Sequence, residues 1–194
     1  MWAVEDYRER ARLMAMTVNG LPIPYSGTDK YPTYLTWMEG IRRRLTDIGG
    51  MEDVLQYLEK AIEIYIDLKQ RHCQACLLHG DLHQENMLLN SEGGYTIIDP
   101  KGVVDDPVME TARFLMNETK QHDETEKILE MVAIISPITG YSQQDILRSM
   151  YIDAALSQSW CMEEHYQTRE AFLAAKHNAL ETCEFVLGLV NRHG

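Results

Sequence analysis

The chain lacks any apolar run long enough to cross a membrane. Its longer apolar stretches, such as Ala75 to Leu78, span only a few residues, whereas a spanning helix needs roughly 20. The N-terminus, Met1 to Asp6, has neither the basic flank nor the apolar segment of a signal peptide. We therefore expect a soluble, cytoplasmic protein that makes no membrane contact.

Basic residues are also scarce. The 18 Lys and Arg stand against 30 Asp and Glu, which gives a formal net charge of -12. Such a charge repels phosphate backbones and anionic lipids, and it favours cationic small molecules near the surface. We therefore expect no nucleic acid partner.

Cysteine is rare as well. Of the 4 cysteines, only Cys73 and Cys76 form a Cys-x-x-Cys pair, whereas Cys161 and Cys183 stand alone. A structural zinc site normally needs a second ligand pair at matching spacing, and a redox motif normally opens a helix after a strand. Because this pair lies between an expected helix and an expected strand, we interpret all the thiols as reduced and partly buried.

The spacing of apolar residues predicts one mainly helical domain. A length of 194 residues with 45% hydrophobic content suits a single core. Steps of three and four predict helices over residues 3–18, 33–47, 55–72, 108–117, 124–135, 142–163 and 169–191. Pro137 and Gly140 are expected to interrupt the fifth of these, and Ser142 to cap the next. We find no repeat, linker or βαβ alternation, so we expect one domain over residues 1–194.

A single segment is rich in strand signals. Residues 76–79, 86–89 and 95–98 are short apolar runs, and residues 91–94 read Ser-Glu-Gly-Gly, a hairpin turn between the last two. The expected fold class is therefore mainly α with a small β-hairpin insert.

The residues best suited to chemistry flank this hairpin. Residues 79–86 read His-Gly-Asp-Leu-His-Gln-Glu-Asn, and residues 97–102 read Ile-Ile-Asp-Pro-Lys-Gly. Transfer of a γ-phosphoryl group needs a carboxylate to align the acceptor hydroxyl and oxygen ligands to hold Mg²⁺ against the phosphates. Asp81 suits the first task, and Asn86 and Asp99 suit the second. We predict that these three side chains converge at the open end of the hairpin.

Both motifs resemble those of kinase-like phosphotransferases, in which His-x-Asp is followed by Asn five residues after the Asp, and later by a second Asp. The sequences of residues 79–83 and 98–102 are similar to motifs of the aminoglycoside phosphotransferase superfamily. Within it, they resemble the branch that contains streptomycin 6-kinases and hydroxyurea phosphotransferases. The similarity continues through residues 106–115 and, more weakly, through residues 154–156 with Trp160. It implies the C-terminal lobe of a protein-kinase-like fold.

The resemblance also implies residue roles. Asp81 would be the catalytic base, Asn86 and Asp99 would bind Mg²⁺ and through it ATP, the phosphoryl donor, and His79 would be a structural residue of the catalytic loop. Glu110 stands where many relatives have an Asp that braces this loop.

Two further residues near the motifs receive smaller roles. We expect His83 to make a supporting hydrogen bond rather than to take part in the chemistry. Lys101 is interpreted as a solvent-facing loop residue outside the site.

The implied acceptor is a hydroxyl of a small molecule, with an aminoglycoside antibiotic such as streptomycin as the candidate. Acidic residues on the later helices, including Glu163, Glu164 and Glu181, can attract such a polycation, although charges of this kind more commonly form a solvated helix face. Small neutral hydroxyl compounds stay open as alternatives.

The sequence shows no counterpart of the small β-rich lobe that grips ATP in relatives. The 78 residues before His79 are expected to be helix or loop, without a Gly-rich loop after a strand. We therefore expect a lobe that is inactive alone. Apolar residues beside the place of that lobe, namely Trp2, Val4, Met87 and Leu89, would be partly uncovered and favour self-association.

Two other functions fit parts of the sequence. His79, Asp81 and His83 alternate, and on a continued strand they would face one way as ligands of a hydrolytic metal ion. Gly80 and the polar residues after His83 favour a loop instead. The non-enzymatic alternative is a kinase-like lobe that acts as a binding module.

Overall fold

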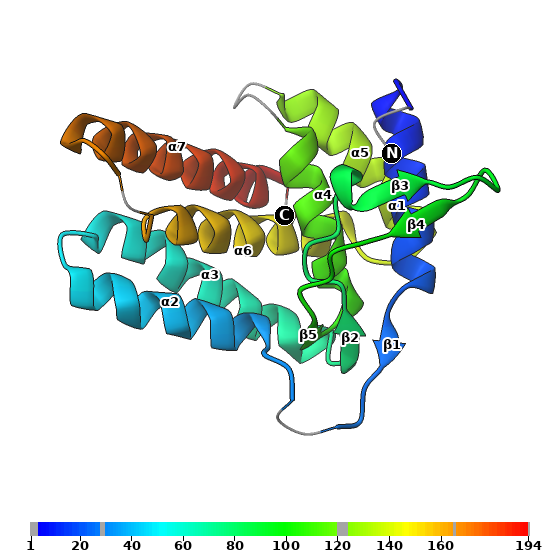
Figure 1. Ribbon diagram of the computed structural model, residues 1–194, viewed down its shortest axis with the longest axis horizontal. Helices are drawn as coiled ribbons and strands as arrows, with labels where there is room; N and C mark the ends of the chain where they lie inside the picture. Colours follow the sequence, from blue (N-terminus) through cyan, green and yellow to red (C-terminus); the bar gives the residue numbers. More distant parts are fainter. Residues whose placement is uncertain (1–3, 28–29, 120–123, 165, 194) are drawn as a thin grey trace.

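The computed structural model describes residues 4–27, 30–119, 124–164 and 166–193 (Figure 1). In chain order its elements are α1 (Tyr7–Gly20), β1 (Ile23–Pro24), α2 (Tyr34–Ile48), α3 (Glu52–Arg71), β2 (Cys76–Leu78), η1 (Gln84–Asn86), β3 (Met87–Leu89), β4 (Tyr95–Ile97), β5 (Val103–Asp105), η2 (Pro107–Met109), α4 (Glu110–Glu118), α5 (Thr125–Thr139), α6 (Gln143–Cys161) and α7 (Arg169–His193). The predicted class, mainly α with a small β-hairpin, is confirmed.

Helix α6 forms the centre of the fold. It packs against α3, α4 and α7. Helix α1 packs against α5 on the right of Figure 1, away from the left-hand ends of α2 and α7. The side chains of α6 are buried over most of its length, among them Met150, Tyr151 and Leu156, none of which is measurably exposed. Each such apolar side chain stabilises the fold by about 1.5–3 kcal/mol relative to exposure.

The predicted hairpin is present. β3 and β4 pair antiparallel, with Met87 opposite Ile97 and Leu89 opposite Tyr95. Asn90 closes the turn, because its N–H donates to the Gly94 carbonyl over 2.9 Å. Met87, at the start of the hairpin, is buried, whereas Leu88 and Leu89 nearer the turn are exposed.

A second sheet was not predicted. β2 lies between β1 and β5, and both pairings are antiparallel. The expectation of only helix or loop before His79 is thus wrong at Ile23–Pro24, and strand structure extends beyond the hairpin to Val103–Asp105. Strands of two and three residues are too short to show a period of two, and one of them contains proline.

The effect of Pro137 on its helix also differs from the expectation. Helix α5 continues past this proline to Thr139, and Gly140 ends it in the left-handed conformation, with φ 79°. The Gly140 N–H donates to the Ser136 carbonyl over 2.9 Å. Glycine rather than proline therefore sets the end of this helix.

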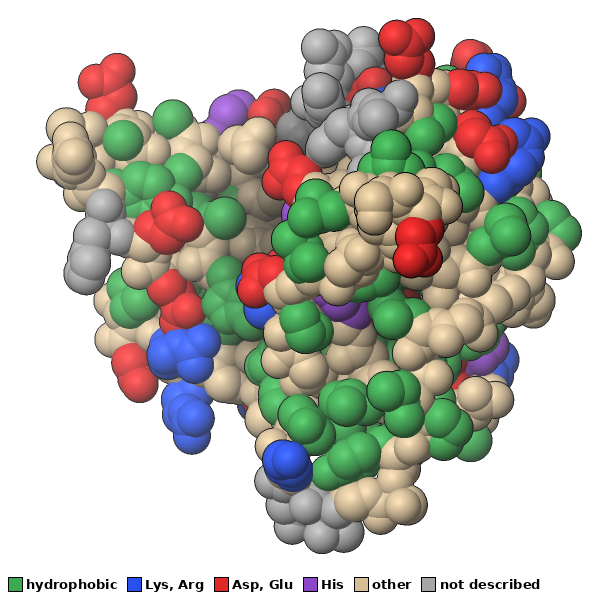
Figure 2. Space-filling view, turned by 45° about the vertical axis from the view of Figure 1, so that its right-hand side comes forward, with side chains coloured by type: hydrophobic (Ala, Val, Ile, Leu, Met, Phe, Trp, Pro, Cys, Tyr) green, Lys and Arg blue, Asp and Glu red, His purple; other side chains and the backbone are tan. Residues whose placement is uncertain are grey.

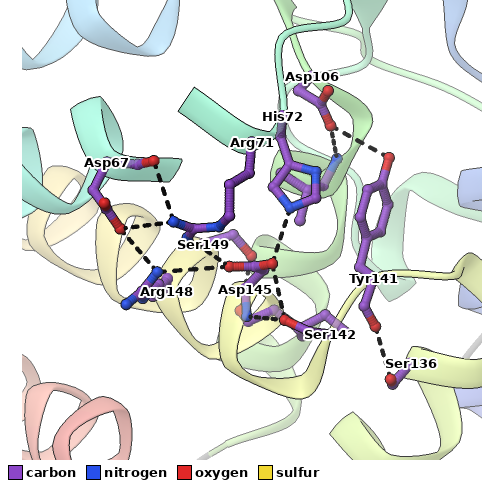
Figure 3. A network of polar contacts seen from close by, with 12 residues as sticks. Asp67, Arg71, His72, Asp106, Ser136, Tyr141, Ser142, Asp145, Arg148 and Ser149 are labelled. Atoms are coloured by element: carbon purple, nitrogen blue, oxygen red, sulfur yellow. Dashed lines mark hydrogen bonds and ion pairs between the residues drawn. The ribbon is translucent and has the colours of Figure 1, made fainter. Parts of the chain in front are cut away.

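A polar network joins the end of α3 to the start of α6 (Figure 3). The Asp145 carboxylate lies 2.9 Å from both Arg71 Nη2 and His72 Nε2, and it accepts from the Ser142 hydroxyl over 2.8 Å. Burial favours the neutral acid, but these hydrogen bonds outweigh it and hold the pKa of Asp145 below its ordinary value. The Ser142 oxygen in turn accepts from the Asp145 N–H, so the predicted cap of α6 is confirmed.

The described residues include no membrane-spanning helix and no disulfide bond. None of the described helices is long and apolar enough to span a membrane. The cysteines are free, with Cys76 and Cys183 buried and Cys73 exposed.

Candidate active site

A tight turn after β2 presents the Asp81 carboxylate. Gly80 has φ 78°, and a Cβ at this position would lie 2.9 Å from Val103 Cγ1. Both the backbone conformation and the close approach of β5 therefore require glycine. Asp81 follows directly and remains partly exposed at the rim of the turn.

Glu110, the first residue of α4, holds this turn from below. Its buried carboxylate accepts from the N–H groups of His79, over 3.0 Å, and of Gly80, over 2.8 Å. Burial raises the pKa of Glu110 to about 7, although the two N–H groups oppose the shift. The contacts are those of a brace between α4 and the loop that carries Asp81.

His79 is fully engaged by the backbone. Its Nε2 lies 2.8 Å from the Ile98 carbonyl, and its Nδ1 accepts from the Asp81 N–H over 3.2 Å. Neither ring nitrogen is left for a metal ion. Since residues 79–83 form a turn and not a strand, the arrangement required for a hydrolytic metal site is not formed.

The structure brings Asp81, Asn86 and Asp99 together at the open end of the hairpin. The Asn86 side-chain amide donates to the Asp81 carbonyl over 2.9 Å, and the Ile98 N–H donates to the Asn86 carbonyl over 3.0 Å. The Lys101 ammonium lies 2.8 Å from Asp99 Oδ2 and 3.6 Å from Asp81 Oδ2. Asp81, Asn86 and Asp99 therefore lie around one small region.

Asp99 is held in an unusual backbone conformation. Its φ of 57° is left-handed, and no other non-glycine residue in the described part of the chain has a positive φ. Such strain concentrates at functional sites. The hydrogen bond from Lys101 lowers the pKa of Asp99, so the exposed carboxylate is ionised at neutral pH.

His83 lies beside the same residues. Its Nε2 is 3.2 Å from the Asn86 side-chain nitrogen and 3.8 Å from Asp81 Oδ1. Burial lowers the pKa of His83, although Asp81 opposes the shift. These contacts are those of a neutral supporting side chain.

Two cationic contacts of Asp81 escaped sequence reasoning. One is Lys101, which is exposed as expected but also lies 3.6 Å from Asp81 Oδ2. The other is Arg113 of α4, whose Nε lies 3.4 Å from Asp81 Oδ1 and whose Nη2 lies 3.1 Å from Asp153 Oδ1. Asp153 is buried and raises the pKa of Arg113. No local pattern links these residues, because Asp153 is 40 positions away on α6.

Asp81 forms part of the wall of a cavity of about 510 Å³. Its lining comprises Trp37, Gly80, Asp81, Lys101, Arg113, Ser157, Trp160 and Cys161. Trp37 and Trp160 meet edge to face, with ring centroids 5.5 Å apart. A hollow of this size with aromatic walls and a few polar groups suits a small molecule.

The acidic residues expected to attract a cation lie elsewhere. Glu163 is paired with Arg44 of α2, and Glu181 lies 3.3 Å from His177 on α7. Neither of them, nor Glu164, lines the cavity at Asp81. The residues suggested by charge alone are therefore not part of this site.

The apolar surface expected around the hairpin is present only in part. Leu88 and Leu89 are 48% and 59% exposed, and hydrophobic side chains also gather over the lower half of the face in Figure 2. Met87 was expected to be uncovered but is fully buried as part of the hydrophobic core. Val4 is half-buried, and Trp2 lies outside the described residues.

Comparison with known proteins shows which family the chain belongs to. Residues 8–165 match the family described as aminoglycoside/hydroxyurea antibiotic resistance kinase. The chain belongs to this family. Membership confirms the resemblance carried by the two motifs and, with the observed elements, the expected fold class.

Two individual proteins are similar to this member of the family. Streptomycin 3''-kinase of Klebsiella pneumoniae is 25% identical over 167 residues, which are 82% of this chain and 59% of that protein. The crystal structure of an aminoglycoside phosphotransferase from Alicyclobacillus acidocaldarius subsp. acidocaldarius DSM 446 superposes with a TM-score of 0.49 at 12% identity, covering 95% of this chain and 55% of the other. The chain thus spans little more than half the length of either relative.

Proposed function

We propose that the chain is the catalytic and substrate-binding lobe, over residues 1–194, of a phosphotransferase that moves the γ-phosphoryl group of ATP to a hydroxyl of a small molecule. One observation carries the proposal. Asp81 lines a cavity of about 510 Å³, and Asn86 and Asp99, which do not line it, lie close to Asp81. Membership of a kinase family supports the same chemistry.

In this proposal Asp81 aligns the acceptor. A hydroxyl that enters the cavity can donate to the Asp81 carboxylate, which then accepts its proton as the phosphoryl group is transferred. Glu110 fixes the backbone before Asp81 through two hydrogen bonds, and Arg113 contacts the carboxylate from the cavity side. Positioning of this kind supplies most of the catalysis in phosphoryl transfer.

The donor atoms fit Mg²⁺. The Asn86 amide nitrogen donates to the Asp81 carbonyl, which leaves Oδ1 of Asn86 and the Asp99 carboxylate as the oxygen ligands that Mg²⁺ would use. No group of three or more His, Cys, Asp or Glu residues in the described part of the chain could hold a metal ion by itself. Mg²⁺ is commonly held by one or two protein oxygens together with the phosphates of the substrate, so two protein ligands suffice. The bound ion would neutralise charge on the phosphates.

The candidate acceptor is an aminoglycoside such as streptomycin, because a similar protein is named for that substrate and the family for aminoglycosides and hydroxyurea. An antibiotic-resistance role follows from this choice. The sequence contains no Gly-rich loop after a strand, so ATP would need a further lobe to hold its phosphates.

The experiment is a transfer assay with ATP, Mg²⁺ and streptomycin, using the chain alone and fused to the N-terminal lobe of the Klebsiella relative. We expect negligible transfer by the chain alone and measurable transfer by the fusion. In the fusion, Asp81→Asn should lower kcat by at least about 100-fold with little change in KM, because the carboxylate acts on the transition state.

The matched control for this variant is Asp47→Asn, at an exposed position of α2. It should retain full activity. A fusion whose kcat survives Asp81→Asn would refute the role of Asp81.

A further inference from the structure

A second cavity adjoins the one at Asp81. It lies between α4, α6 and α7 and has a volume of about 320 Å³. Arg113, Ser157 and Cys161 line both cavities. Because the two share this wall, an acceptor built of two linked rings can place one ring in each.

The lining of the second cavity is polar but almost without charge. Amide, hydroxyl and apolar side chains line it together. Arg113 is the one charged side chain among the described lining residues. The apolar members include Met116, Met150 and Phe185.

Three lining amides are unused. The side chains of Asn117, Gln158 and Asn178 make no hydrogen bond to the part of the chain that the structure describes. Each amide offers two N–H donors and a carbonyl acceptor. Ligand hydroxyls both donate and accept hydrogen bonds. A ring that carries several hydroxyls can therefore bond to both the N–H groups and the carbonyl oxygens of these amides.

The described lining offers no partner to a cationic ring at this position. Arg113 already lies 3.1 Å from Asp153 and 3.4 Å from Asp81, and none of the described residues that line the second cavity carries a carboxylate. An ammonium or guanidinium group placed there would lose its water without gaining an anionic partner. A further anion would compete with two carboxylates for Arg113.

We propose that the second cavity binds an uncharged, hydroxyl-rich ring of the acceptor, a sugar or cyclitol ring, while the hydroxyl that receives phosphate lies at Asp81 in the first cavity. The assignment of the ring to an acceptor rests on the proposed function. Binding of the ring itself depends only on the second cavity.

The test is NMR of the labelled chain during titration with myo-inositol, a neutral polyol. We expect the side-chain amide signals of Asn117, Gln158 and Asn178 to shift together, while that of Asn191, an exposed residue near the end of α7, stays fixed. Asn178→Leu should weaken binding about three- to tenfold, the effect of one or two lost hydrogen bonds. The control Asn191→Leu, on the same helix, should leave binding unchanged.

Several results separate this inference from the proposed function. Absence of any shift at the three amides with myo-inositol overturns the inference. It also fails if streptomycin shifts the indole signals of Trp37 and Trp160 but none of the three amides, a result that leaves the proposed function standing. If the amides respond to myo-inositol but Asp81→Asn leaves transfer intact, the neutral ring site holds and the proposed chemistry falls.

Discussion

The Lys101 ammonium lies 2.8 Å from Asp99 Oδ2, so the carboxylate proposed to hold Mg²⁺ is already paired with a cation. The hydrogen bond raises the pKa of Lys101 and lowers that of Asp99. A divalent cation at Asp99 would therefore meet a fixed positive charge, and the two must compete or share the carboxylate.

Lys101→Met tests this competition. Removal of the ammonium should tighten binding of Mn²⁺, used as a probe for Mg²⁺, by about two- to fivefold, the strength of an exposed ion pair. Isothermal titration calorimetry measures the change. Lys60→Met, at an exposed ion pair on α3, should leave the affinity as it is, and an unchanged affinity in Lys101→Met would show that the ammonium does not oppose the ion.

Glu110 should make stability depend on pH. Its pKa is about 7 in the folded chain, against the ordinary value of 4.5. The folded state thus holds this proton more tightly, and its contribution to stability is lost as pH rises from about 4.5 through 7. The change amounts to at most about 3 kcal/mol for a shift of this size.

The measurement is urea unfolding across that pH range. In Glu110→Gln this fall with pH should disappear, so the difference between the two free energies of unfolding should change as pH rises from about 4.5 through 7, whatever constant offset the amide introduces. Glu92→Gln in the exposed hairpin turn is the control, with a curve parallel to the unchanged chain. Parallel curves for Glu110→Gln would mean that its carboxyl titrates normally.

Arg113 and Asp153 should be coupled in stability. Arg113→Met leaves a buried carboxylate without its ion pair, which costs about 3–5 kcal/mol. Adding Asp153→Asn removes the uncompensated charge and should restore part of the loss. A double-mutant cycle by urea unfolding measures the coupling, and strictly additive effects would contradict the pairing.

Gly80 and Gly93 form a natural pair for the turn before Asp81. Both have positive φ, 78° and 82°, but an added Cβ meets Val103 only at Gly80 and open space at Gly93. Gly80→Ala should therefore destabilise the fold by about 1–3 kcal/mol more than Gly93→Ala, the usual cost of overpacking. If both variants lose the same stability in thermal unfolding, the Val103 side chain moves aside at no cost.

Much of the fold follows from local pattern. Steps of three and four place the helices within a few residues, and the Gly-Gly turn with its flanking apolar runs gives the β3–β4 hairpin. The same hairpin explains how Asn86 and Asp99, 13 positions apart, come to lie beside Asp81. Short-range geometry was enough for these parts.

The rest depends on contacts between distant segments. β1 and β5 exist because β2 offers them backbone partners, and neither has an internal signal. Lys101 and Arg113 contact Asp81 only once the loop, α4 and α6 are packed together. Met87 is buried in the core formed by the packed chain, which periodicity over three residues does not determine.

Under the proposed function, Asp81, Asn86 and Asp99 enclose one metal-dependent phosphoryl-transfer centre. NMR of the labelled chain during titration with Mn²⁺ tests it most directly, because a paramagnetic ion broadens the signals nearest to it. We predict that the side-chain amide of Asn86 and the backbone amides of Asp81 and Asp99 broaden first, and that Asp99→Asn weakens this effect at least about tenfold. Broadening centred on another part of the chain, or undiminished in Asp99→Asn, would contradict it.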